Sequence, residues 1–306
     1  MSAGPTLTIV VTIVDGGHYL RDFLLAVMAM EDAPPMEIIV PYDASINGTK
    51  LLVDEFPQVR LIDMGMVTPA YPLHTQSGQH ELYDRRRSCG LAAATGDIIG
   101  MLEDRGHPSR DWAKTLIRLH AQGKYNVIGG AIECMEPVNL MHWAFYVTDF
   151  GRYGRPFESG STSWVSDVNV SYTPKALADT RELWIDRFWE MIVHRALMDR
   201  GEELHLSNEL VVNHRRPPIT FGKLLQERRD WGNLFGFVRT KRTSALGRIG
   251  LIVMSPLIPP TLWVRHGLIQ ARKGRGLRYL LALPYVIMMT TAWTLGEVRG
   301  YITRRP

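Results

Sequence analysis

Three consecutive charged residues, Glu103, Asp104 and Arg105, follow the apolar run of residues 98–102. Two adjacent carboxylates at the end of a buried strand are energetically costly unless a cation or hydrogen-bond donors bind them. A carboxylate pair followed at once by an arginine is therefore a candidate ligand-binding site. Alternatively, the two acids cap the next helix or form ion pairs with Arg105 and Arg110, as many surface acids do.

The elements around this tripeptide alternate between short apolar runs and amphipathic segments. Strands that alternate with helices indicate an α/β fold with a mainly parallel sheet and helices on both faces. In such sheets ligands bind at the carboxyl ends of the strands. Glu103 and Asp104 lie at one such end, and Asp15 and Asp43 lie at two others. We expect strands at residues 7–14, 36–42, 59–64, 97–103 and 126–133, and helices at 19–30, 81–95 and 109–123.

Two further motifs accompany the tripeptide. Asp43 and Ser45 follow the second expected strand, and a helix with arginines at 85–87 leads through Gly90 into the segment LAAATGD. In these features the sequence resembles the family 2 glycosyltransferases, which have the GT-A nucleotide-sugar fold, Rossmann-like and mostly parallel. The family's Arg-Asn-x-Gly helix motif is similar to the segment RSCG that begins at Arg87.

The resemblance implies a binding site for a nucleotide-sugar donor. In the family, an Asp-Asp-Gly-Ser-like turn holds the base and the ribose, and Asp43 and Ser45 match its last positions. Residues 159–177 are similar to a family segment in which an asparagine, here Asn169, precedes an aromatic residue and a basic helix start. The donor-binding residues implied in this way are Thr12, Val14, Asp15, Asp43, Ser45, Arg87, Glu103, Asp104, Arg105 and Asn169.

The family's Asp-x-Asp metal motif falls on Glu103, Asp104 and Arg105. The resemblance therefore implies that Asp104 and Glu103, together with His214, hold Mg²⁺ or Mn²⁺. Such an ion would stabilise the charge of a departing nucleoside diphosphate. Arg105 occupies the position of the third acid. Because arginine binds phosphate through bidentate contacts, we expect Arg105 either to replace part of the metal's work or to point away from the site.

Residues 185–217 are similar to the region of the family that carries the acceptor-activating acid. The match gives Glu190 as the general base that takes the proton of the acceptor hydroxyl during an inverting transfer. Asp186, expected one helical turn earlier on the same face, is its substitute. Alternatively, Glu190 is only an i,i+4 partner of His194 on a solvated helix.

Residues 224–236 resemble a degenerate form of the Gln-x-x-Arg-Trp motif of processive relatives. Gln226 and Arg229 match this motif, whereas Asp230 separates the arginine from Trp231. Gln226 and Arg229 are therefore further candidates for substrate binding. A basic amphipathic helix lying on a membrane is the alternative for this segment.

The C-terminal region, residues 221–306, differs in composition from the GT-A domain that we expect at 1–220. Its segments 249–264 and 279–296 contain no charged residue and fall slightly short of the ~20 apolar residues of a spanning helix. The connector between them is strongly basic, which contradicts the positive-inside rule if both segments cross a bilayer. We therefore expect an interfacial or re-entrant hydrophobic helical hairpin. Two spanning helices and a buried subdomain are the alternatives.

These features predict a membrane-associated inverting glycosyltransferase at the cytoplasmic face, with a lipid-linked or cell-envelope glycan as acceptor. Two cysteines without paired spacing fit a reducing compartment. An inactive glycosyltransferase-like binding or scaffold subunit is the alternative that the missing third acid suggests. A nucleotidyltransferase would need a Gly-rich basic loop after the first strand, but residues 15–22 contain one arginine and two acids. Nucleic acid is not an expected partner, because the C-terminal basic residues lie between apolar segments.

Overall fold

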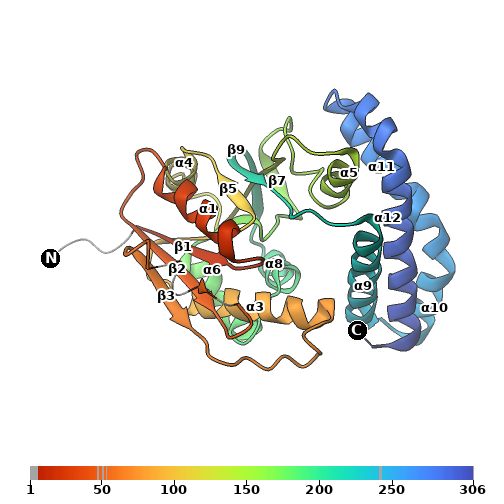
Figure 1. Cartoon of the computed structure of the whole chain (residues 1–306), viewed down its shortest axis with the longest axis horizontal. Helices are drawn as coiled ribbons and strands as arrows, with labels where there is room; N and C mark the ends of the chain where they lie inside the picture. Colours follow the sequence, from red (N-terminus) through yellow and green to blue (C-terminus); the bar gives the residue numbers. More distant parts are fainter. Residues whose placement is uncertain (1–5, 47, 50–51, 53, 241–242, 306) are drawn as a thin grey trace. The chain divides into compact units, whose positions relative to one another are not determined.

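The computed structural model of the chain describes residues 6–46, 48, 49, 52, 54–240 and 243–305 (Figure 1). The chain divides into two compact units. The first unit comprises Met1–Thr68, Glu81–Glu133 and Arg155–Arg215, and the second unit comprises Pro69–His80, Cys134–Gly154 and Arg216–Pro306. The second unit therefore joins two internal segments to the C-terminal region.

The first unit is built on one mixed β-sheet. Its strand order is β3-β2-β1-β4-β8-β6-β9-β5, and β7 pairs with β9. β1 lies between β2 and β4, and all of its residues are buried, as its β-branched apolar sequence predicts. The strands are β1 (Leu7–Thr12), β2 (Met36–Tyr42), β3 (Val59–Asp63), β4 (Ile98–Glu103), β5 (Gly106–Pro108), β6 (Val127–Cys134), β7 (Gly160–Thr162), β8 (Asn169–Tyr172) and β9 (Leu204–His214).

The expected α/β class is confirmed, but the prediction of a mostly parallel sheet is wrong for half of the sheet. β3, β2, β1 and β4 are parallel neighbours. β8 is antiparallel to β4 and β6, and β9 is antiparallel to β5 and β7. β4 and β6 therefore run in the same direction, as the helix between them predicts. β8 arrives between them from a distant segment, and this insertion leaves no periodic signal in the sequence.

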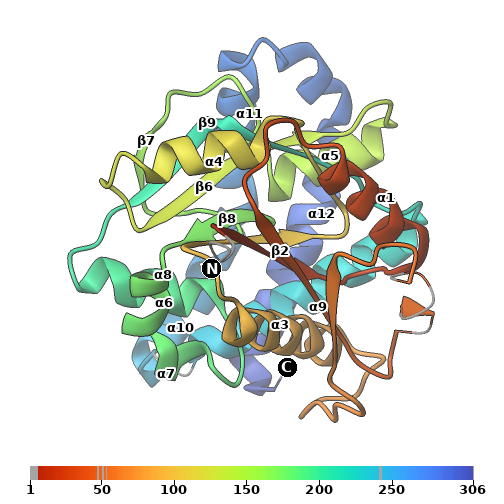
Figure 2. The ribbon, with the colours of Figure 1, turned by 90° about the vertical axis from the view of Figure 1, so that its left-hand side faces the viewer.

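Helices cover both faces of this sheet, as predicted (Figures 1 and 2). Side chains at successive positions of a strand point to opposite faces, so Ile9 and Val11 of β1 enter one core cluster and Val10 enters the other. The first cluster includes α1 (Gly17–Met28) and α4 (Trp112–His120). The second includes residues of α3 (Gln76–Ala93), α6 (Pro174–Asp179), α7 (Arg181–Trp184) and α8 (Glu190–Asp199).

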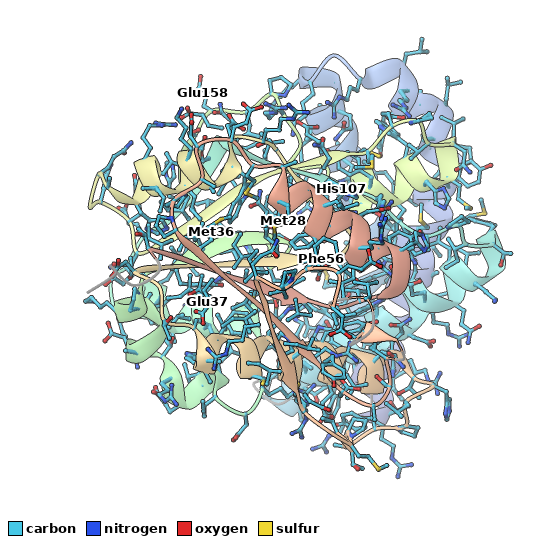
Figure 3. All side chains as sticks on the ribbon, turned by 60° about the vertical axis from the view of Figure 1, so that its left-hand side comes forward. Met28, Met36, Glu37, Phe56, His107 and Glu158 are labelled. Atoms are coloured by element: carbon cyan, nitrogen blue, oxygen red, sulfur yellow. The ribbon has the colours of Figure 1, made fainter. Side chains whose placement is uncertain are left out.

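The core on the face of α1 includes side chains near the end of that helix and near the starts of β2 and β3. Phe56 is buried in this core, and Met28 and Met36 pack against it (Figure 3). Because protein interiors are close-packed, these contacts hold α1 against the sheet.

The second unit is helical. α12 packs along α9 and also contacts α5 and α11. Glycines allow the α9 and α12 backbones to approach closely: a Cβ added to Gly232 would collide with the carbonyl oxygen of Trp293, and one added to Gly296 would collide with that of Arg229. The helices are α5 (Leu140–Asp149), α9 (Phe221–Thr240), α10 (Ala245–Met254), α11 (Ile258–Arg272) and α12 (Gly276–Thr303).

Two segments of the second unit, Ala245–Arg272 and Gly276–Thr303, are long and apolar enough to cross a membrane. The expected pair of C-terminal apolar helical segments is thereby confirmed, and by length and composition both could associate with a membrane. The first segment is divided into α10 and α11 by a 3₁₀ turn at Ser255–Leu257. Two prolines, Pro259 and Pro260, follow this turn in the first turn of α11, where the missing N–H groups are tolerated.

Candidate functional site

The carboxylate of Asp104 holds the loop that follows β1. β1 and β4 are parallel and paired up to their last residues, so both chains leave the sheet at the same edge. The Asp104 carboxylate accepts hydrogen bonds from the backbone N–H groups of Val14 (3.0 Å), Asp15 (3.1 Å) and Gly16 (2.7 Å). Gly16 has a φ of 68°, a conformation that favours glycine at this position of the loop. Burial raises the pKa of Asp104 to about 6.

Arg86 joins the loop after β1 to the turn after β2. Its buried guanidinium donates hydrogen bonds to the carboxylate of Asp43 (2.7 Å), the carbonyl oxygen of Ile13 (2.7 Å) and the hydroxyl of Ser45 (2.8 Å). Asp43 is buried as well and accepts a hydrogen bond from the Ser45 N–H (2.8 Å). Since a buried charge is stable only when it is paired and hydrogen-bonded, Arg86 fixes the shape of this turn.

Arg87, the next residue of α3, lies among several carboxylates. Its Nη2 is 2.7 Å from Oε1 of Glu103 and 2.7 Å from Oδ2 of Asp167, and its Nη1 is 3.3 Å from Oδ1 of Asp84. The charge of Glu190 also acts on Arg87. Burial, followed by the charge of Asp167, raises the pKa of Glu103 to about 7. Burial and the charge of Asp167 therefore favour the protonated form of Glu103, whereas the charge of Arg87 lowers its pKa and favours the ionised form.

Arg105 forms a bidentate ion pair with Asp15. Its Nε and Nη2 donate hydrogen bonds to the two carboxylate oxygens at 2.6 and 2.9 Å. The Arg105 side chain is 20% exposed, and that of Asp15 is 23% exposed. Among the residues that the structure describes, the Arg105 Nη1 group has no hydrogen-bond partner. The pair thus holds the guanidinium in one orientation and leaves one N–H edge for a ligand.

A close approach of α3 to the sheet brings the two arginines to this edge. A Cβ on Gly90 would collide with Cγ1 of Val10 and would lie 3.1 Å from Cγ of Pro41. Only glycine allows α3 to pack so closely on β1 and β2. The glycine of the RSCG segment therefore positions Arg86 and Arg87, which lie one turn earlier on the same helix.

The structure brings most of the predicted donor-site residues to one edge of the sheet. His214 at the end of β9 pairs with Gly106, directly after Arg105. Glu190 is the first residue of α8 and interacts electrostatically with Arg87. The remaining residues lie at the ends of β1, β2 and β4, in the turns that follow them or on α3: Thr12, Val14, Asp15, Asp43, Ser45, Arg87, Glu103, Asp104 and Arg105.

Asn169 has a different environment from the one expected. It is fully buried, and its amide nitrogen donates to the carbonyl oxygens of Ala131 (2.9 Å) and Leu210 (3.0 Å). Its amide oxygen accepts a hydrogen bond from Nε1 of Trp112 (3.0 Å). Both donor hydrogens are therefore used inside the protein, where they join neighbouring strands of the sheet.

The prediction that Asp186 lies one helical turn before Glu190 on the same helix is wrong. α7 ends at Trp184 and α8 begins at Glu190, so the residues between them are not helical. The N–H of Phe188 donates instead to the carbonyl oxygen of Asp84 (3.2 Å). This contact with α3 holds the chain extended before α8, and Asp186 is an exposed residue of the connection.

Gln226 and Arg229 lie on α9 in the second unit, and both are exposed. Their neighbour Arg228 is buried, where its Nη1 is 2.5 Å from Oδ1 of Asp149 on α5. The segment is thus an amphipathic helix whose buried face carries an ion pair.

Two residues of the site were missed in the sequence, Arg86 and Asp167. The run of three arginines was a signal for Arg86, since consecutive helical residues that are all basic cannot all face solvent on a packed helix. Asp167 had no comparable signal. It lies beside the end of β4 because β8 is antiparallel to β4, with Asn169 opposite Leu102. A parallel sheet does not predict this contact.

The described residues do not fit a divalent metal as they are arranged. Among them there is no group of three or more His, Cys, Asp and Glu side chains placed to hold a metal ion. Both oxygens of Asp104 already accept backbone N–H groups. Glu103 is paired with Arg87, and the third position of the motif carries the cation Arg105.

Comparison with known proteins gives a likeness of fold. No protein-family model and no curated protein sequence matches the chain. Among solved structures, the chain is similar to the mannosyltransferase PcManGT from Pyrobaculum calidifontis, which was solved in complex with GDP-Man and Mn²⁺. The TM-score is 0.55 at 14% sequence identity, and the match covers 98% of this chain and 88% of the mannosyltransferase.

Proposed function

We propose that this chain is a membrane-associated inverting glycosyltransferase of the family 2, GT-A type. It would move a sugar from a nucleoside-diphosphate sugar to an acceptor hydroxyl. The observation that carries the proposal is the joining of three strand-end segments by two buried side chains, Asp104 and Arg86. A rigid polar edge of this kind, at the carboxyl ends of parallel strands, suits a nucleotide ligand. The fold likeness to a mannosyltransferase bound to GDP-Man supports the same class of donor.

In this proposal the base and ribose of the donor lie against the turn after β2 and the loop after β1, where Asp43, Ser45 and Asp15 are fixed. Arg105 contacts the diphosphate, and its remaining N–H edge serves as the donor of a charge-assisted hydrogen bond. Because the described residues do not fit a metal, no step of the proposal goes through Mg²⁺ or Mn²⁺. Metal dependence remains a prediction, which the assay below tests directly.

Glu190 is the proposed general base. It takes the proton of the acceptor hydroxyl while the hydroxyl oxygen bonds to the sugar carbon and the bond to the diphosphate breaks on the opposite face. The leaving group departs as a nucleoside diphosphate, and its added negative charge needs a nearby cation. The electrostatic interaction of Glu190 with Arg87 supports its placement near the donor site. Asp186 remains the second candidate, from an exposed connection.

The apolar C-terminal helices support the proposed association with a membrane, and we propose its cytoplasmic side as the location. A lipid-linked or cell-envelope glycan acceptor would be concentrated there, which raises its effective concentration at the enzyme. Gln226 and Arg229, exposed on α9, are candidates for contacts with such an acceptor.

The test is a screen of UDP-, GDP- and dTDP-sugars for stabilisation of the full-length chain and for release of nucleoside diphosphate, each with excess Mn²⁺ and with EDTA. At least one donor is expected to raise the melting temperature and to turn over when a glycan acceptor is present. Glu190→Gln is expected to bind that donor and to lose transfer. If none of the donors stabilises the protein under either condition, the donor site is wrong.

An inactive binding subunit is the second candidate function, because Arg105 replaces the third acid of the metal motif. It predicts stabilisation by a nucleotide-sugar without turnover. In that case Glu190→Gln would leave every measured property unchanged.

A further inference from the structure

One face of α12 is exposed along the entire length of the helix. Its residues recur at the three- and four-residue spacing of a single helical stripe, and the stripe contains no charged residue before Arg299. A continuous exposed apolar surface of this kind marks a contact with a protein or a membrane. The exposed residues of α12 are Leu277, Leu280, Leu281, Pro284, Met288, Thr291, Leu295, Arg299, Ile302 and Thr303.

α10 and α11 add apolar surface to this unit. α10 has no buried residue, and Leu246, Ile249 and Val253 are 79%, 56% and 68% exposed. On α11, Val264 and Leu268 are more than half exposed. A soluble unit would cover helices of this composition in its own core, so this surface needs an apolar partner.

The charge of the same region indicates which partner it is. Residues 245–305 contain nine Lys and Arg residues and one acid, Glu297. Glu297 is buried and accepts hydrogen bonds from Arg239 (2.9 Å) and Tyr301, so the exposed charges are all positive. Apolar stripes bordered by Arg and Lys are complementary to the acyl chains and anionic headgroups of a lipid bilayer.

From Tyr285 onward, the opposite face of α12 packs against α9. The rings of Phe221 and Tyr285 lie 5.5 Å apart, and those of Phe235 and Trp293 lie 5.8 Å apart. Both contacts fall within the uncharged segment 279–296 of α12, and they show that the two helices run in the same direction. If this segment of α12 enters the membrane to a given depth along its length, α9 must enter to a similar depth beside it.

α9 is too polar to lie at the centre of a bilayer. Between Phe221 and Phe235 it exposes Lys223 and Arg229 and carries the half-buried acid Asp230. Charged side chains at the bilayer centre are strongly disfavoured. If α12 spanned the bilayer, these residues would be carried into the hydrocarbon, whereas a helix lying in the plane of the membrane keeps them at its polar surface.

We propose that the C-terminal hairpin lies in one leaflet of an anionic membrane and does not cross it. α10, α11 and the exposed stripe of α12 face the acyl chains, and α9 stays on the aqueous side. The turn between α11 and α12, at residues 273–275, therefore remains on the same side of the membrane as the sheet. This inference deepens the membrane association in the proposed function and is independent of the transfer reaction.

The test compares two single-cysteine reporters in the full-length chain, with Cys89 and Cys134 replaced by serine. Arg272→Cys reports on the end of α11, and Glu31→Cys, at a site where the native side chain is 65% exposed, reports on the sheet unit. Right-side-out and inside-out vesicles from expressing cells are treated with a maleimide that does not cross membranes. Labelling after detergent gives the total for each reporter and shows that each variant is intact.

We expect both reporters to be labelled in the same vesicle orientation and protected in the other. Labelling in opposite orientations would mean that the hairpin spans the bilayer, and the inference would be wrong while membrane association would stand. If the chain is instead recovered in the soluble fraction, it does not associate with the membrane, and both the inference and the proposed membrane association are wrong. A second measurement needs no cysteine: the chain should bind vesicles that contain phosphatidylglycerol more tightly than vesicles of phosphatidylcholine alone. Equal binding to the two kinds of vesicle would contradict the proposed preference for an anionic membrane.

Discussion

At the scale of single residues, the neighbours Arg85 and Arg86 show how differently two arginines of one helix contribute. Arg86 is fully buried and bonds three groups of two strand-end segments. The Arg85 side chain is 38% exposed and pairs with Glu81 on its own helix. Arg86 connects two segments of the site, whereas Arg85 forms an ion pair within α3.

We expect Arg86→Gln to lower the free energy of unfolding by about 3–5 kcal/mol, because Asp43 would remain as a buried carboxylate without its partner. Arg118→Gln is the control and should cost less than about 1 kcal/mol, because both side chains of the Arg118–Glu209 pair are exposed (51% and 55%). Urea denaturation of both variants measures the difference. Equal losses would show that Arg86 does not carry the connection between the loop and the turn.

Glu103 gives the first unit a pH-dependent stability. Its pKa is raised from 4.5 to about 7 by burial and by Asp167. Between these values the unfolded chain releases the proton and the folded chain keeps it, so this group makes the protein less stable as the pH rises through that window. Glu103→Gln removes this loss, and Arg87 keeps Asp84 and Asp167 as partners.

We therefore expect Glu103→Gln to be more stable than the wild type by about 1–3 kcal/mol near pH 8 and of similar stability near pH 4. Melting temperatures across this range test the prediction. Glu55→Gln, at a 52% exposed side chain, is the control and should follow the wild-type profile. If Glu103→Gln follows the wild-type profile, the Glu103 carboxyl of the wild type is ionised across this pH range and the prediction is wrong.

Arg105 is the residue that the donor site depends on most if the proposed function holds. Loss of a charge-assisted contact to the diphosphate predicts that Arg105→Gln binds the donor about 10- to 100-fold more weakly. Calorimetric titration with the donor found in the screen measures this change. Arg110→Gln is the control, since the Arg110 side chain is 76% exposed and pairs with Glu31. Unchanged affinity would place Arg105 outside the site.

At the scale of elements, the packing of α3 on β1 can be tested by filling the gap at Gly90. A methyl group there would collide with Val10, and overpacking of this kind costs about 1–3 kcal/mol. We expect Gly90→Ala to be destabilised by that amount in thermal denaturation. Val10→Ala in the same chain should recover part of the loss by making room. If the double variant shows simple addition of the two losses, the contact is not the cause.

The elements also show what the sequence could predict and what it could not. The ends of β2 and β4 were predicted correctly, and the end of β1 was placed two residues too late. Each of these apolar runs is followed by an acidic residue, and this placed Asp15, Asp43 and Asp104 at one edge. The place of β8 was not predictable, since strand pairing depends on contacts between distant segments that leave no local pattern. The start of α8 at Glu190 was missed for the same reason, because it depends on a contact between Phe188 and α3.

At the scale of the whole molecule, charge and apolar surface are distributed unevenly along the chain. The net charge of the 306 residues is only +4, while residues 245–305 carry nine basic residues against one acid. Composition therefore predicted a membrane-facing C-terminal region before any helix was placed. The basic connector between the two apolar segments also predicted an interfacial hairpin, and the pairing of α12 with α9 supports the in-plane arrangement that we propose.

Apolar contact and charge should contribute separately to membrane binding. We expect the triple variant Leu246→Asn, Ile249→Asn and Val253→Asn to bind anionic vesicles more weakly than the wild type, because each exposed side chain loses roughly 1.5–3 kcal/mol of burial at full insertion. Since α10 has no buried residue, the variant should keep its melting temperature in detergent. Leu25→Asn, at a 44% exposed position of α1, is the control and should bind as the wild type does. Co-sedimentation at increasing salt separates the two terms, because salt screens the basic residues but not the apolar stripe. If the triple variant binds normally at high salt, α10 does not enter the membrane.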